Sequence, residues 1–163
     1  MNNLTDLEKK INSELTSKIK FSETKHSQLY LSIESNDLID VLLFLKNDPS
    51  TKFKQLIDIT AVDYPQESKR FKLVYMLLSH EFNNRIILNY LINEHEVIPS
   101  IIELFPSANW MEREVFDMYG IEFKDHPDLR RILTDYNFKG HPLRKDFPLT
   151  GFTEVRYSEK NKK

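Results

Sequence analysis

Apolar residues in the first half of the chain recur at helical spacing in two places. Leucine and isoleucine residues three or four positions apart predict an amphipathic helix over residues 4–16. A second stripe predicts a helix over residues 38–45, which ends before Pro49 because proline cannot continue a helix. Each predicted helix therefore has one face to bury against a core.

Five other segments have the alternating or β-branched apolar pattern that is typical of strands. A polar turn over residues 22–27 separates the first two segments, and the polar loop Glu81–Asn84 makes the last two a hairpin. The predicted strands are residues 18–21, 29–33, 56–62, 71–78 and 85–92.

The pattern changes after these strands. Ser100–Phe105 has the character of one or two helical turns, and Pro106 ends them. Ser107 is then placed to cap a helix over residues 108–119, and Gly120 is placed to end that helix in the left-handed conformation.

No sustained periodicity follows, although the remaining segment is rich in aromatic residues that need a surface to bury them. Two similar stretches in this segment begin with His126-Pro127 and His141-Pro142, and each His-Pro pair sets a turn ahead of a basic pair. We interpret residues 121–163 as an arm that packs on a surface.

Composition excludes several kinds of function. The chain has no cysteine, which rules out disulfides, thiolate catalysis and cysteine-held iron–sulfur clusters. Its first 119 residues contain no glycine, so phosphate-binding loops and dinucleotide fingerprints are absent from that part. No apolar run reaches the ~20 residues of a membrane helix. The first twenty residues carry Asp6, Glu8 and Glu14, no arginine and no long apolar stretch, and we expect neither a signal peptide nor a transit peptide.

Four side chains could be assembled into a metal site, and they would define a metal-dependent enzyme. They are His126, Asp128 and His141, together with Glu112, or alternatively Glu114, from the preceding helix. Both histidines precede prolines in irregular chain, where the simpler role is a turn whose imidazole bonds to the backbone. We favour the turn.

The helix before the arm carries Glu112, Arg113, Glu114 and Asp117 within two turns. Arg113 and Asp117 have the i, i+4 spacing of an intrahelical ion pair. The carboxylates could perform acid–base chemistry, form a solvated charged face, or meet a partner, and the sequence shows no nucleophile that would need them.

The arm is basic, with a net charge of +3 over residues 120–163 against −5 over residues 1–119. Arginines interleaved with aromatic residues could bind nucleic acid, but nearby aspartates such as Asp128 and Asp146 weaken that interpretation. Planar arginine contacts to the carboxylates or carbonyls of a protein partner explain mixed charges better, and a solvated face is the alternative.

The motifs themselves resemble a known family. The stretches ITAVDYP, EREVFDMYGI, HPDLRRIL and GHPLRKDFPL, the last three within the block that runs from Phe105 to Tyr157, are similar to the 30-kilodalton subunit of NADH:quinone oxidoreductase, respiratory complex I. The last of these stretches is most similar to mitochondrial and alphaproteobacterial members. The matching C-terminal block covers about a third of the chain.

The resemblance implies an α+β fold, in which a compact two-layer domain with helices on a mixed sheet spans residues 1–120 and an extended arm spans residues 121–163. It implies a structural and assembly role in the peripheral arm of the complex, which transfers electrons from NADH to ubiquinone. The family binds no cofactor in this subunit, so FMN, iron–sulfur clusters and ubiquinone are expected elsewhere in the complex.

The resemblance also implies partners and a location. We expect contacts with other peripheral-arm subunits, especially the 49-kilodalton subunit, no nucleic acid, and association with the membrane only through the complex. The matrix side of the mitochondrial inner membrane is the expected location, with the cytoplasmic face of a bacterial inner membrane as the alternative. The residues expected at partner interfaces are Glu112, Arg113, Glu114, Asp117, His126, Asp128, Arg130, Arg131, His141, Arg144, Lys145 and Asp146.

Overall fold

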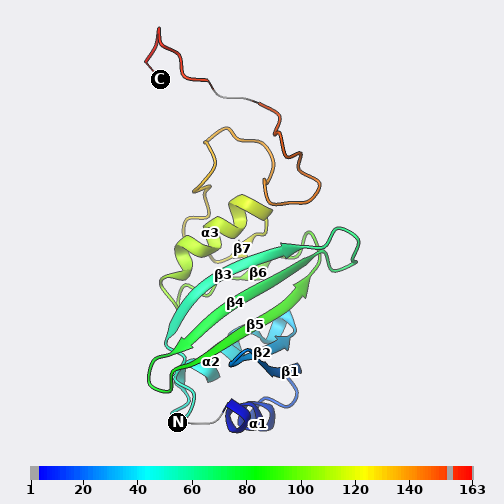
Figure 1. Cartoon of the computed structure of the whole chain (residues 1–163), viewed down its shortest axis with the longest axis vertical. Coiled ribbons are helices and arrows are strands. Elements are labelled where there is room, and N and C mark those ends of the chain that lie inside the picture. The colour runs from blue at the N-terminus through cyan, green and yellow to red at the C-terminus, as the bar shows by residue number, and fades with distance from the viewer. Residues whose placement is uncertain (1–3, 154–155, 163) are drawn as a thin grey trace.

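A mixed five-stranded sheet lies at the centre of the computed structural model, which describes residues 4–153 and 156–162 (Figure 1). Glu154, Val155 and Lys163 of the expected arm lie outside the described residues. The strand order is β1-β2-β5-β4-β3; β2 and β5 run parallel, and the other neighbours are antiparallel. The strands are β1 (Ile19–Lys25), β2 (Gln28–Ile33), β3 (Gln55–Asp63), β4 (Phe71–Ser79) and β5 (Asn84–Ile92).

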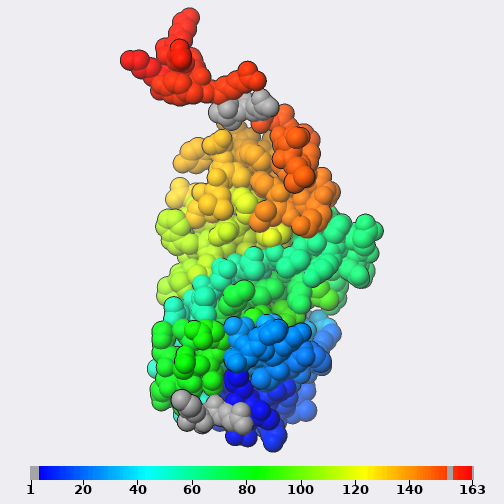
Figure 2. Space-filling model, in the orientation of Figure 1, coloured from blue at the N-terminus to red at the C-terminus, as the bar shows by residue number. Residues whose placement is uncertain are grey.

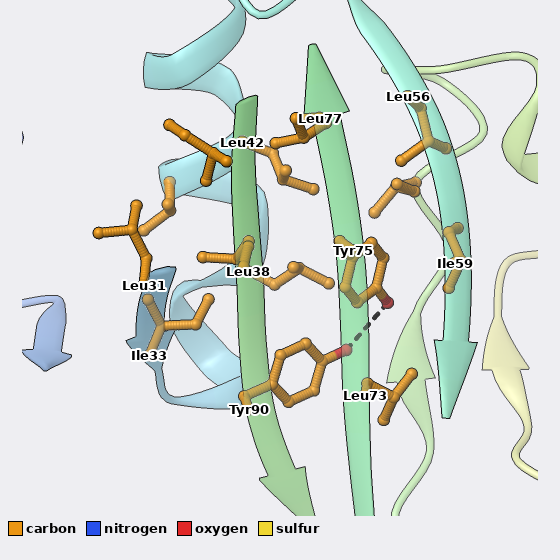
Figure 3. Packing of buried hydrophobic residues seen from close by; sticks show 14 of the residues in the cluster. Leu31, Ile33, Leu38, Leu42, Leu56, Ile59, Leu73, Tyr75, Leu77 and Tyr90 are labelled. Carbon is orange, nitrogen blue, oxygen red and sulfur yellow. Dashed lines mark hydrogen bonds between the residues drawn. The ribbon is translucent and has the colours of Figure 1, made fainter. Parts of the chain in front are cut away.

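One face of this sheet packs against helices, because its strands alternate buried and more exposed residues. Helix α1 (Leu4–Glu14) lies near β1, and helix α2 (Leu38–Asn47) follows a single 3₁₀ turn, η1 (Ser35–Asp37). Leu38 and Leu42 of α2 point toward the strands in Figure 3. The two layers enclose one apolar core.

Two tyrosines occupy the middle of this core. Tyr75 of β4 and Tyr90 of β5 are almost completely buried, and their hydroxyl groups hydrogen-bond to each other at 3.0 Å (Figure 3). The pair satisfies two buried polar groups that would otherwise be costly.

Helix α3 (Ala108–Tyr119) packs against β3 beside a small parallel sheet of β6 (Ile98–Pro99) and β7 (Phe123–Lys124). Gly120 ends α3 in the left-handed conformation with φ of 75°, as the sequence predicted. Ser107 stands at the predicted N-cap position, but its side chain makes no capping hydrogen bond. Its φ of −63° and ψ of −22° are helical, whereas a capping side chain needs extended backbone.

The predicted α+β class and both N-terminal helices are confirmed. The predicted polar turn over residues 22–27 was too long, because β1 and β2 continue to a two-residue turn at His26 and Ser27. Both turn residues have positive φ, which matches the twist of a tight hairpin. Residues 100–105 form only one turn, closed by the Phe105 N–H and the Ile101 carbonyl at 2.8 Å.

Beyond β7 the chain is irregular and loops over the far side of α3 from the main sheet (Figure 1). Figure 2 shows the gold and orange part of this segment against the yellow-green surface of α3, while the red C-terminal residues extend away from it. None of the described helices is long and apolar enough to cross a bilayer.

Candidate functional site: the junction of α3 and the C-terminal arm

Asp117 of α3 is the centre of the junction. Its carboxylate is buried and accepts hydrogen bonds from the backbone N–H groups of residues 132, 133 and 134 at 2.8–3.0 Å. The Thr134 hydroxyl and Arg131 Nη1 donate to its other oxygen at 2.6 and 2.7 Å. Burial alone would raise the pKa of Asp117, but these donors outweigh it and hold the pKa far below its usual range. Asp117 therefore fastens the arm in its ionised form.

Arg113 fastens the same loop from the neighbouring helical turn. Its Nε and Nη2 donate to the carbonyl oxygens of Arg130 and Arg131 at 3.0 and 3.1 Å. The predicted intrahelical pair of Arg113 with Asp117 was wrong, because the arm supplies partners with better geometry to both side chains.

Glu112 faces the other way, into the interior. Its carboxylate accepts from the Ser100 hydroxyl and the Ile101 N–H, both at 2.7 Å, and lies 3.9 Å from His126 Nε2. Burial raises the pKa of Glu112 to about 7, although the two donors oppose the shift. Glu112 thus ties α3 to the chain that follows β6.

The two His-Pro turns bond to the backbone, as predicted. His126 Nε2 donates to the Asn109 carbonyl at 3.1 Å, and its Nδ1 accepts from the Asp128 N–H at 3.1 Å. His141 Nδ1 donates to the Asp117 carbonyl at 2.9 Å. Burial lowers the pKa of His141, which favours the neutral ring.

The second His-Pro turn leads into a cluster of charges at the end of the main sheet. Asp63 of β3 accepts two hydrogen bonds from Arg70, at 2.8 and 2.9 Å, and one from the Lys145 N–H at 2.7 Å. Hydrogen bonding to Arg70 lowers the pKa of Asp63 despite its burial. Arg70 also pairs with Asp146 at 2.9 Å.

Arg144 and Glu94 complete this cluster. Arg144 Nη1 donates to Glu94 at 2.9 Å, and its Nε donates to the Tyr119 carbonyl. Its guanidinium lies over the Phe71 ring, 5.3 Å from the centroid. Gly120 makes this packing possible, because a Cβ there would lie 2.8 Å from Arg144 Nη2.

Three members of this cluster were not predicted from the sequence: Asp63, Arg70 and Glu94. Asp63 stands in the ITAVDYP motif, and this motif was the one feature of the sequence that could have pointed to a member of the cluster.

The four candidate metal ligands do not converge. Glu112 and His126 are buried together, whereas Asp128 is exposed and pairs with Arg130 at 2.9 Å. His141 lies at the other end of α3. Over residues 4–153 and 156–162, no three metal-ligating side chains are close enough to hold an ion.

Comparison with known proteins now decides the family. Residues 31–153 match the family described as respiratory-chain NADH dehydrogenase, 30 Kd subunit. The chain belongs to this family. All of the EREVFDMYGI and HPDLRRIL residues at the junction lie within the matched range.

Curated relatives from alphaproteobacteria agree with this family. The C subunit of NADH-quinone oxidoreductase from Chelativorans sp. strain BNC1 is 49% identical over 98% of this chain and 80% of its own length. The protein of the same name from Ruegeria pomeroyi is 57% identical over 83% of this chain and 68% of its own length.

Solved structures of related chains have the same fold. A trypsin-resistant fragment of Nqo5 has a TM-score of 0.64 at 25% identity, covering 77% of this chain and 98% of the fragment. A chain of the archaeal membrane-bound sulfane sulfur reductase, a respiratory membrane complex, has a TM-score of 0.77 at 25% identity, covering 89% of this chain and 85% of that one.

In this member of the 30 Kd subunit family, the residues expected at partner interfaces fall into two groups. One group makes hydrogen bonds within its own chain, and contact with a partner stays a prediction for these residues too: Glu112, Arg113, Asp117, His126, Arg131, His141 and Arg144. The others keep exposed side chains, and partner contact stays a prediction for them: Glu114, Asp128, Arg130, Lys145 and Asp146.

Large apolar side chains of the arm are exposed beside this second group. The exposed fraction is 95% for Tyr136, 63% for Leu133 and 74% for Phe152. The sequence pattern does not indicate which aromatic residues of the arm are exposed, because their exposure depends on the path of a chain without regular secondary structure.

Proposed function

We propose that the chain is a structural and assembly subunit in the peripheral arm of an NADH-quinone oxidoreductase, the complex I of the respiratory chain. The family match and the names of its alphaproteobacterial relatives support this function. In this role the domain supports the quinone-reducing module while electrons pass from NADH to quinone.

The observation that carries the proposal is the contrast between order and exposure in the arm. Residues from 126 to 147 are fixed to α3 and to the end of the sheet, yet apolar side chains such as Tyr136 and Leu143 face outward. Exposed apolar clusters on an ordered segment are typical of surfaces that bind other proteins.

We also propose that the subunit is not itself catalytic, and that FMN, the iron–sulfur clusters and ubiquinone are bound by other subunits. Its ionisable groups at the junction support this role. Asp117 has five donors on two oxygens, and both ring nitrogens of His126 have backbone partners. Groups held in this way are suited to fixing a structure.

The domain over residues 1–120 and the arm over residues 121–163 are proposed to share the assembly role, with the arm as the main contact to neighbouring subunits. The 49-kilodalton subunit is the first partner to test. The chain is proposed to reach the membrane only through the complex, on the matrix side of the mitochondrial inner membrane or on the cytoplasmic face of a bacterial one.

The test is affinity purification of the tagged full-length chain from detergent-solubilised membranes of its own host. The tagged chain is expected in an assembly that oxidises NADH with a quinone acceptor and contains flavin and iron–sulfur clusters, and mass spectrometry is expected to identify the 49-kilodalton subunit. Recovery of the chain alone, or with ribonucleic acid, would contradict the proposal.

A further inference from the structure

The loop from Ile132 to Tyr136 has no helix or strand, yet hydrogen bonds to Asp117 hold its first three residues. Three consecutive backbone N–H groups, at residues 132, 133 and 134, point to one oxygen of Asp117. Burying a carboxylate is costly, and this one is compensated only because all these donors converge on it. The contacts hold the backbone of the first three residues of this surface loop.

The side chains that this backbone displays are apolar and uncovered. Leu133, whose N–H donates to Asp117, is 63% exposed, and Tyr136, two positions after Thr134, is 95% exposed. Trp110, on the adjacent face of α3, is 66% exposed, and its ring centroid lies 5.6 Å from the guanidinium of Arg113. A cavity of about 460 Å³ lies among Trp110, Arg113 and the loop.

From this geometry we propose that Trp110, Leu133 and Tyr136 form an anchor patch for a protein partner, and that Asp117 is the positioning residue that presents it. The inference rests on the proposed function, and the occupant is a neighbouring subunit of the same oxidoreductase. That subunit packs an apolar side chain against Trp110, Leu133 and Tyr136 at the edge of the cavity, whose lining also includes Arg113 and Asp135.

The chemistry of the patch favours a protein over other occupants. Trp, Tyr and Arg are the residue types that dominate binding energy at protein interfaces. The exposed charges at the rim have both signs, since Arg130 pairs with Asp128 and Asp135 is an exposed residue of the loop itself. A nucleic acid or an anionic lipid surface would need a strongly basic rim.

Preorganisation explains why a buried carboxylate holds a surface loop. A flexible loop that displays apolar anchors loses conformational entropy each time it binds, whereas a loop already held in its bound conformation does not. Asp117 thus favours docking without touching the partner.

The first experiment replaces the anchors. The double variant Leu133→Ser/Tyr136→Ser and the single variant Trp110→Ser, in the tagged full-length chain, are each expected to reduce recovery of the assembled oxidoreductase by roughly tenfold or more. Phe21→Ser is the matched control, because Phe21 is 59% exposed on β1, outside the arm. It is expected to leave recovery unchanged.

The second experiment separates positioning from simple stability. Asp117→Asn is expected to reduce recovery by a similar factor, and adding it to Leu133→Ser/Tyr136→Ser is expected to cause little further loss, because both changes disable one patch. Additive losses would mean that Asp117 acts only through stability and would overturn its positioning role.

The remaining outcomes are distinguishable. If the wild-type chain assembles and all patch variants assemble equally well, the anchor patch is wrong while the proposed function stands. If the wild-type chain does not assemble, the proposed function itself fails. Patch-dependent binding of RNA, or patch-dependent self-association of the pure chain, would overturn the choice of a neighbouring subunit as occupant.

Discussion

The sheet domain and the arm are stabilised by opposite means. In the domain, residues such as Leu31, Leu77 and Leu88 are completely buried in a continuous apolar core. In the arm, many of the contacts that fix the chain are hydrogen bonds to carboxylates and carbonyls; the Asp117 carboxylate accepts five of them, and Asp63 accepts one from Lys145. Apolar burial is the main source of stability in the domain, whereas in the arm Ile121 and Phe123 join the core and later apolar side chains such as Leu133 and Tyr136 stay exposed.

This difference shows how a segment without regular structure can be ordered before it docks. Each acceptor belongs to an element that the core already holds: α3 supplies Asp117 and β3 supplies Asp63. The arm therefore takes its shape from the domain, and its stability depends on groups far away in the sequence, such as the Asp63 contact with Lys145 across 82 positions.

The largest expected effect is in the core. Leu88→Ala on the central strand β5 removes a completely buried side chain and should lower the free energy of unfolding by about 2–5 kcal/mol. Leu91→Ala on the same strand, where the side chain is 42% exposed, should cost far less. Urea denaturation measures both changes, and equal losses would contradict the assignment of the buried face.

The next largest effect is a pH dependence of the unfolding free energy, and it is expected from Glu112, which links α3 to the chain that follows β6. The pKa of Glu112 is raised from 4.5 to about 7, so the folded state holds this proton more tightly than the unfolded state does. Its stabilising contribution is complete below pH 4.5 and is lost as the pH rises through 7, a change of about 3 kcal/mol.

Glu112→Gln keeps an acceptor oxygen for the Ile101 N–H, and its amide NH2 can donate to the Ser100 hydroxyl oxygen, but it does not titrate. The difference in unfolding free energy between the variant and the wild type should therefore shift in favour of the variant by about 3 kcal/mol between about pH 4.5 and about pH 7.5. Urea titrations across this range measure it. The titration of His141 is common to both proteins and cancels in the difference. Parallel pH profiles would show that Glu112 ionises normally.

A smaller effect is expected where the arm crosses the end of α3. Gly120→Ala introduces a Cβ at a φ of 75°, only 2.6 Å from His141 Nε2, and should cost about 1–2 kcal/mol while loosening the arm. Gly151→Ala is the control, because its φ is also positive but no atom lies within 4 Å of the new Cβ. Thermal unfolding and amide exchange at Leu143 report the difference, and equal effects would argue against close packing at Gly120.

The smallest effect is expected at the exposed end of the arm. Leu149 has a fully exposed side chain, so Leu149→Ser should change the unfolding free energy of the isolated chain by no more than about 0.5 kcal/mol. A larger loss in urea denaturation would mean that this part of the arm packs on its own domain.

Periodicity in the sequence located the strands of the main sheet and the helices α1, α2 and α3, because each has one face to bury. The pairing of β6 with β7 was not predictable, since two-residue strands carry no period. The acceptors of Arg131 and Arg144 were also missed. A sequence shows that an arginine in an apolar context needs an acceptor, but not whether that acceptor lies in the same chain.

The arm is fastened to its own domain before any partner binds, and amide hydrogen exchange of the isolated full-length chain tests this most directly. Slow exchange is expected for the N–H groups of Leu133 and Thr134, bonded to Asp117, and for that of Lys145, bonded to Asp63. Asp117→Asn should accelerate the first two and leave Lys145 protected. Exchange of all three in the wild type at the rate of an unstructured peptide would contradict the fastening of the arm.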